Sequence, residues 1–93
     1  MYYAIVYDSI TRVSKAEKLL KQMHNNPLNW RIEQLSTVAR AYGLSENRPG
    51  SGGSHVTFRA PNGDKVTVPD HRPIRPIYVK LFVRLIEEVC HHE

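Results

Sequence analysis

Residues 54–69 contain the pattern that most restricts the fold of this 93-residue chain. Two short segments, SHVTFRA and DKVTV, alternate polar and apolar side chains, which is the period of a β-strand with one buried face. Asn62-Gly63 lies between them, and this dipeptide is typical of a two-residue hairpin turn. The pattern therefore predicts an antiparallel hairpin. Its buried face would carry four apolar side chains, those of Val56, Phe58, Val66 and Val68.

The same alternation assigns a set of polar side chains to the solvent face of the hairpin. They are His55, Thr57, Arg59, Lys65 and Thr67. His55 is the one histidine of the predicted strands, and it follows the run GSGGS at residues 50–54. Glycine lets backbone N–H groups approach a phosphate, but a plain hairpin loop has the same composition. From the strand pattern alone, a surface histidine without a function is the more frequent explanation of His55.

Three other segments show the helical period of apolar residues. The predicted helices cover about 14–24, 31–42 and 76–90, and a short strand is expected at 44–48. The last helix is expected to bury Tyr78, Leu81, Phe82, Leu85, Ile86 and Val89. Trp30 and Tyr42 are expected in the core, while His71 and Arg72 are assigned a turn role after the third strand. The order helix, helix, three-stranded meander, helix predicts a two-layer α+β sandwich.

Positive charge is concentrated in the second half of a chain whose formal net charge is +4. Between residues 48 and 86 the acidic residues are Asp64 and Asp70 alone. The basic residues of the same range are Arg48, Arg59, Lys65, Arg72, Arg75, Lys80 and Arg84. This half is a candidate surface for a polyanion, although many soluble proteins without a nucleic-acid partner carry a similar net charge.

The two ends of the chain indicate a compartment and a domain boundary. A single cysteine, Cys90, excludes an internal disulfide, and no membrane segment or signal sequence is predicted, so we expect a cytoplasmic protein. The consecutive residues 90–93, CHHE, would point in different directions from a helix, so no metal site is expected there.

Residues 1–13 are interpreted as an extension that could self-associate, and residues 14–93 as the domain.

The run GSHVTFRAPNGDKVTVPDHRPIRPIYVKLFVRLIEE, with the preceding NPLNWRIEQLSTVARAYGL, resembles the HicA family of toxin ribonucleases. The family signature is Gly-Ser-His-His, an aromatic residue, a Pro-x-Gly-type turn and a Thr-Val-Pro strand end. The matching residues are Gly53, Ser54, His55, Phe58, Pro61, Gly63, Thr67, Val68 and Pro69. The resemblance covers about residues 14–89. It implies a fold like that of double-stranded-RNA-binding domains (dsRBD-like), here with an additional N-terminal helix.

The resemblance implies an enzyme that cleaves mRNA and is neutralised by a HicB-like antitoxin. Its catalytic residue would be His55, the first histidine of the signature. The signature departs at position 56, where Val56 replaces the second histidine, and in the insert RPGSGG, where Gly52 replaces a basic residue. Because the strand pattern points position 56 into the core, the change to Val56 is expected to affect packing more than catalysis. Loss of the basic residue would weaken phosphate binding.

The chemistry of imidazole supports the same residue. Imidazole exchanges a proton near neutral pH, and cleavage of RNA by its own 2′-hydroxyl needs one proton removed, so no metal or other cofactor is required. Candidate RNA-binding residues are Gly53, Ser54, Arg59, Lys65, Lys80 and Arg84, with Arg59 and Lys65 expected to flank His55. Two alternatives remain: a non-catalytic module that binds RNA or the antitoxin, and a pure protein-interaction domain.

Overall fold

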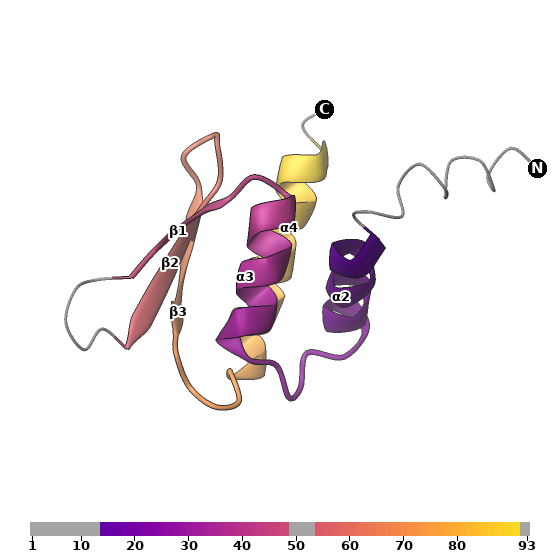
Figure 1. Ribbon diagram of the computed structural model, residues 1–93, viewed down its shortest axis with the longest axis vertical. Coiled ribbons are helices and arrows are strands. Elements are labelled where there is room, and N and C mark those ends of the chain that lie inside the picture. The colour runs from indigo at the N-terminus through magenta and orange to yellow at the C-terminus, as the bar shows by residue number, and fades with distance from the viewer. Residues whose placement is uncertain (1–13, 49–53, 92–93) are drawn as a thin grey trace, which may run out of the picture.

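The computed structural model describes residues 14–48 and 54–91. Its elements are α2 (Ser14–Asn25), α3 (Ile32–Ala41), β1 (Ser45–Asn47), β2 (His55–Arg59), β3 (Lys65–Pro69) and α4 (Pro76–His91), as Figure 1 shows. The predicted helices and strands are confirmed, and the chain has the predicted α+β class. Gly53 and the predicted extension at 1–13 lie outside the described residues.

The three strands form one antiparallel sheet in the order β1-β2-β3. In the β2–β3 hairpin, His55 lies opposite Pro69 and Arg59 lies opposite Lys65. Val56, Phe58 and Val68 are buried, which confirms the predicted buried face at these positions, and Val66 is partly buried. The alternation therefore predicts the register correctly, because a slip by one residue would expose this apolar set.

The hairpin loop differs from the predicted two-residue turn. The N–H of Gly63 donates to the carbonyl of Ala60 at 2.9 Å, and the N–H of Ala60 donates to the carbonyl of Asp64 at 2.7 Å. Pro61 and Asn62 therefore occupy the centre of a β-turn, and Gly63 follows with a φ of 98°. Proline favours the first central position of such a turn, so the turn begins one residue earlier than the Asn-Gly pair indicates.

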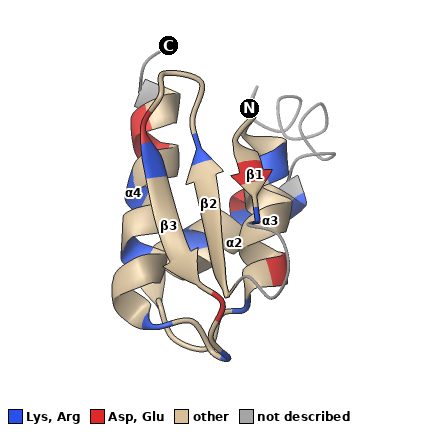
Figure 2. Ribbon diagram, turned by 90° about the vertical axis from the view of Figure 1, so that its left-hand side faces the viewer, with Lys and Arg blue, Asp and Glu red and all other residues tan. Residues whose placement is uncertain are grey.

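One face of the sheet is covered by α3 and α4, and α2 lies on the far side of these two helices (Figure 1). The core between sheet and helices includes Val56, Phe58, Val68, Leu35, Val38, Phe82 and Ile86. The rings of Phe58 and Phe82 meet edge to face, with centroids 5.0 Å apart. Figure 2 looks onto the opposite face of the sheet, where the strands lie in front of the helices.

The set of α4 side chains that is buried differs from the predicted set. Val79 and Val83 are buried, whereas Leu81, which was expected inside, is 40% exposed. The reason is that α4 packs against both β3 and α2, so two sides of this helix are covered. At 16 residues α4 is the longest helix of ranges 14–48 and 54–91, where no helix combines the length and apolar composition of a membrane span.

Trp30 and Tyr42 belong to the core, as predicted. The Trp30 ring is buried, and its Nε1 donates to the carbonyl of Asn26 at 2.7 Å. Tyr42 is partly buried against the core, and burial raises the pKa of its phenol, with smaller contributions from Cys90 and Glu17. Gly43 follows α3 with a φ of 80°, the left-handed conformation predicted for the residue that ends this helix.

Candidate active site

His55 begins β2 on the open face of the sheet, where its side chain is exposed. The next residue, Val56, points into the core and is fully buried. Along the open face from His55, the hydroxyl groups of Thr57 and Thr67 lie 2.9 Å apart and form a hydrogen bond across the hairpin. The predicted placement of His55 on the solvent face is therefore confirmed.

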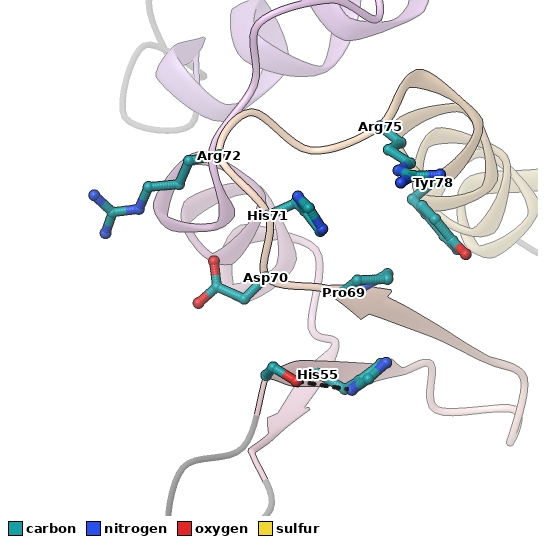
Figure 3. Close-up of a pocket in the computed structure, with 8 residues that line it drawn as sticks. His55, Pro69, Asp70, His71, Arg72, Arg75 and Tyr78 are labelled. Atoms are coloured by element: carbon teal, nitrogen blue, oxygen red, sulfur yellow. Dashed lines mark hydrogen bonds between the residues drawn. The ribbon is translucent and has the colours of Figure 1, made fainter.

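A pocket of about 460 Å³ lies beside His55, where three segments of the chain meet. The start of β2 contributes Ser54 and His55, the segment after β3 contributes Asp70, His71 and Arg72, and the start of α4 contributes Arg75 and Tyr78. Figure 3 shows the rings of His55 and His71 projecting to the same side of the strand end, whereas Asp70 and Arg72 project to the other. Two imidazole groups thus share one pocket.

The segment after β3 is held at both of its ends. At its beginning, the N–H of Asp70 donates to the carbonyl of Ser54 at 2.7 Å, and the N–H of His71 donates to the carbonyl of Pro69 at 2.9 Å. Near its other end, the N–H of the buried Ile74 donates to the carbonyl of Trp30 at 2.8 Å. These bonds place His71 beside the start of β2, because an i to i+2 bond folds the chain back directly after the strand.

Ser54 orients the imidazole of His55. The Ser54 hydroxyl lies 3.4 Å from Nδ1 of His55, a long hydrogen bond that Figure 3 marks with a dashed line. When Nδ1 carries the proton and donates to this hydroxyl, Nε2 keeps its lone pair. The ring can then accept a proton at Nε2 from a molecule in the pocket.

The charges around the pocket favour an anion. Asp70 is its one acidic lining residue, and the Arg48 guanidinium binds the Asp70 carboxylate at 3.3 Å. Arg75 lies at the N-terminus of α4, where its carbonyl accepts the N–H groups of Tyr78 and Val79. A cation beside a helix N-terminus is unfavourable by about 0.3–1 kcal/mol, because that end of the helix dipole is itself positive. A bound anion would compensate both charges.

Arg59 and Lys65 do not flank His55, contrary to the prediction. They share its face, but they lie opposite each other at the far end of the hairpin. Arg59 lies four positions after His55 along the strand, which corresponds to roughly 13 Å at the usual rise per residue. The alternation predicts the face of each side chain correctly, but not its distance from the histidine.

The two basic candidates on α4 also lie away from His55. Arg84 contributes to a second hollow of about 290 Å³, which Lys65, Asp64 and Glu88 also line. The guanidinium of Arg84 is 3.8 Å from the Glu88 carboxylate, so its charge is partly balanced. Lys80 is exposed and does not line either hollow. Of the predicted site residues that the structure describes, only Ser54 and His55 share the pocket.

Five further pocket residues were assigned no chemical function from the sequence, since His71 and Arg72 were given a turn role and Tyr78 a core position; the five are Asp70, His71, Arg72, Arg75 and Tyr78. A signal for three of them exists in the run HRPIR at 71–75, which contains a histidine and two arginines directly after β3. In an antiparallel hairpin the end of one strand lies beside the start of the other. A cationic run after β3 must therefore come close to His55.

Within the described ranges, no group of three or more His, Cys, Asp or Glu side chains is arranged to hold a metal ion. Comparisons of the chain with models of known protein families, with curated proteins and with solved structures find no match.

Proposed function

We propose that this protein is an endoribonuclease that cleaves mRNA without a metal ion, as a HicA-like toxin with a dsRBD-like fold. The order α3-β1-β2-β3-α4 supports this proposal, since the resemblance implies a helix, three antiparallel strands and a helix. The observation that carries the proposal is the pocket beside His55, which a second histidine and two arginines also line. Cleavage of RNA by its own 2′-hydroxyl requires a base beside a bound phosphate.

His55 is the general base of the proposed reaction. Its imidazole is exposed at the pocket, so a ribose can reach it, and the Ser54 hydroxyl can accept a hydrogen bond from Nδ1 in the tautomer whose Nε2 is free to accept a proton. Nε2 would remove the proton of a 2′-hydroxyl, and the 2′-oxygen would then attack the neighbouring phosphorus. A positioned general base contributes about 10²- to 10⁴-fold in rate.

Arg75 provides positive charge for the phosphate, whereas the Arg72 side chain projects to the other side of the strand end and its guanidinium lies 3.7 Å from the Glu33 carboxylate. A guanidinium can bind two phosphate oxygens at once, and the N-terminus of α4 adds its positive dipole end. Arg48 supports this arrangement indirectly, because its ion pair balances the carboxylate of Asp70 at the pocket. The scissile phosphate is therefore proposed to lie between the imidazole groups and the start of α4.

Tyr78 and the other basic residues have a supporting role in the proposed reaction. Tyr78 is a half-buried aromatic side chain at the pocket, suited to stack on an unpaired base next to the cleaved bond. Arg59 and Lys65 would contact phosphates farther along the RNA, as would Lys80 and Arg84 on α4. Such contacts position RNA without reading its sequence.

The proposed partner is a HicB-like antitoxin that neutralises the enzyme in the cytoplasm. We place the antitoxin over the pocket, where it would exclude RNA directly. The arginines of this region favour an acidic partner and would speed its association.

The test is cleavage of a long transcript in EDTA by three forms of the full chain. The wild type is expected to cut the transcript, and His55→Ala is expected to be slower by about 10²- to 10⁴-fold. His24→Ala is the matched control, because His24 is an exposed histidine on α2 that pairs with Glu87 and does not line the pocket. Equal cleavage by the wild type and His55→Ala would overturn the proposal.

A non-catalytic RNA-binding module is the alternative, and the like-charged pair of Arg59 and Lys65 away from the pocket is the feature that favours it. Such a module would bind the transcript with a strong salt dependence and leave it intact. Wild-type protein that binds but does not cut in the same assay would therefore select the alternative.

A further inference from the structure

We infer that His71 is a second catalytic residue of the pocket, the general acid that protonates the leaving 5′-oxygen. The inference rests on the endoribonuclease function proposed above and concerns the half of the reaction that His55 does not perform. A single imidazole can accept the proton of the 2′-hydroxyl, but it does not at the same moment hold a proton for the leaving group.

The proposed step balances with two imidazole groups and no other reactant. His55 takes the proton from the 2′-hydroxyl as the bond between the 2′-oxygen and phosphorus forms. The bond between phosphorus and the 5′-oxygen breaks, and the protonated His71 gives its proton to that oxygen. The products are a 2′,3′-cyclic phosphate on one fragment and a 5′-hydroxyl on the other, with no change in oxidation state.

The other polar residues of the pocket are poor proton donors at neutral pH. A guanidinium holds its protons too tightly to donate one, which excludes Arg72 and Arg75 as the acid. A phenol is a weaker acid than an imidazolium, so Tyr78 is a poorer donor, and a carboxylate in an ion pair, as in Asp70 with Arg48, only accepts hydrogen bonds. His71 carries the second imidazole of the pocket, and imidazole is the type of side chain best suited to proton transfer near neutral pH.

The backbone brings the two histidines together. Pro69 lies opposite His55 in the register, and His71 follows Pro69 by two residues. The Cα atoms of directly opposed hairpin residues are about 5 Å apart, and two residues of chain reach at most about 7 Å farther. A phosphate between the two chain segments would therefore be within reach of both imidazoles. The bond from the His71 N–H to the Pro69 carbonyl holds this position, and Figure 3 shows both rings on one side of the strand end.

The experiment compares two forms of one substrate. The cleavage site is first mapped on a transcript, and a short oligoribonucleotide with that site is then made with either oxygen or sulfur as the 5′-bridging atom. A thiol ionises near pH 8.5, far more readily than an alcohol, so a sulfur leaving group needs no general acid. His55→Ala, His71→Ala and His71→Gln are compared with the wild type, and all four are checked by circular dichroism. Since both histidines are exposed, the variants are expected to fold.

With the oxygen substrate, His71→Ala and His71→Gln should be slower than the wild type by about 10²- to 10⁴-fold. With the sulfur substrate, both should come within roughly tenfold of the wild type, while His55→Ala stays slow because removal of the 2′ proton is still required. The 5′ ends of wild-type products should accept a label from polynucleotide kinase without phosphatase treatment.

Three outcomes would overturn the inference. If His71→Ala is equally slow on both substrates, or as fast as the wild type on the oxygen substrate, His71 is not the acid. In both cases a slow His55→Ala leaves the proposed function intact. If His55→Ala is also as fast as the wild type on both substrates, the endoribonuclease proposal fails together with the inference.

Discussion

The two ends of the β2–β3 hairpin present polar side chains on the same face of the sheet but have very different surroundings. At one end, His55 lies opposite Pro69, and the segment after β3 and the start of α4 enclose a pocket beside it. At the other end, Arg59 lies opposite Lys65, and the chain turns back through Pro61, Asn62 and Gly63. The end with two strong cations thus borders the smaller hollow, which Lys65 shares with Asp64, Arg84 and Glu88 and whose described lining residues include no histidine.

The cause of the difference is the course of the chain. The hairpin loop between Arg59 and Lys65 has five residues, which are too few to cover either side chain. At the His55 end, the chain continues from β3 through a segment pinned to Trp30 and then enters α4. A charge on an open strand is solvated, whereas groups carried by three converging segments can act on one ligand. Convergence of three segments, and not the number of charges, therefore distinguishes the proposed site from the other end of the hairpin.

Replacing one arginine at each end of the hairpin by glutamine is expected to change the rate of RNA cleavage, and this is the largest effect that we predict in this comparison. Arg75→Gln should lower kcat/KM by about 10- to 100-fold, because a hydrogen bond to a charged group is worth about 1.5–3 kcal/mol. Arg59→Gln should lower it by less than about fivefold, the effect of an exposed charge. Cleavage of one transcript at a single salt concentration measures both.

Both arginines are exposed, so the two variants are matched in the type of change and in solvent exposure. Circular dichroism should show that each is folded. An equal loss for both would mean that RNA is held along the whole open face, and the pocket would then have no special role in phosphate binding.

A smaller effect is expected for the ion pair behind the pocket. Arg48→Ala should lower kcat/KM by up to about fivefold, because it leaves the Asp70 carboxylate unpaired where the phosphate is proposed to bind. Asp70→Asn, combined with Arg48→Ala, should restore the lost activity by removing that charge. If the double variant is as slow as Arg48→Ala alone, Arg48 acts through its own contact with RNA and not through Asp70.

The smallest effect concerns stability at the far end of the hairpin. Arg59 and Lys65 are like charges directly opposite each other, which is unfavourable, so Arg59→Glu should raise the free energy of unfolding by about 0.2–1 kcal/mol. Arg59→Gln removes the repulsion without adding an attraction, and its gain should be smaller. Urea unfolding at low salt measures both variants. A loss of stability in Arg59→Glu would show that the two side chains do not interact across the strands.

Much of the fold was predictable because it depends on short-range patterns. The alternation from His55 to Arg59 and from Lys65 to Pro69 is a local property, and it determines which face of each strand is buried. Gly43 likewise ends α3 through its own left-handed conformation. The hairpin turn shows the limit of such reasoning, because Pro61 and the Asn-Gly pair indicate different turns and the structure adopts the one that begins at Ala60.

Positions that depend on distant segments were predicted less well. Leu81 was expected inside because its spacing fits one apolar stripe, but α2 covers a second side of α4 and shifts the buried arc toward Val79 and Val83. Arg59 and Lys65 were expected beside His55 because they share its face. Periodicity gives the direction of a side chain, and it contains no information on which other element lies there.

The sequence by itself determined the hairpin, the exposure of His55 and the three helices, because each follows from the conformational preferences and apolar spacing of neighbouring residues. The hairpin register brings His71 near His55, since the bond from the Asp70 N–H to the Ser54 carbonyl continues the pairing of β2 with β3. The position of Arg75 in the same pocket depends on tertiary contacts, because the N–H of Ile74 donates to the carbonyl of Trp30, 44 residues earlier in the chain. A contact at that separation forms only when the core packs, so no local pattern of residues specifies it.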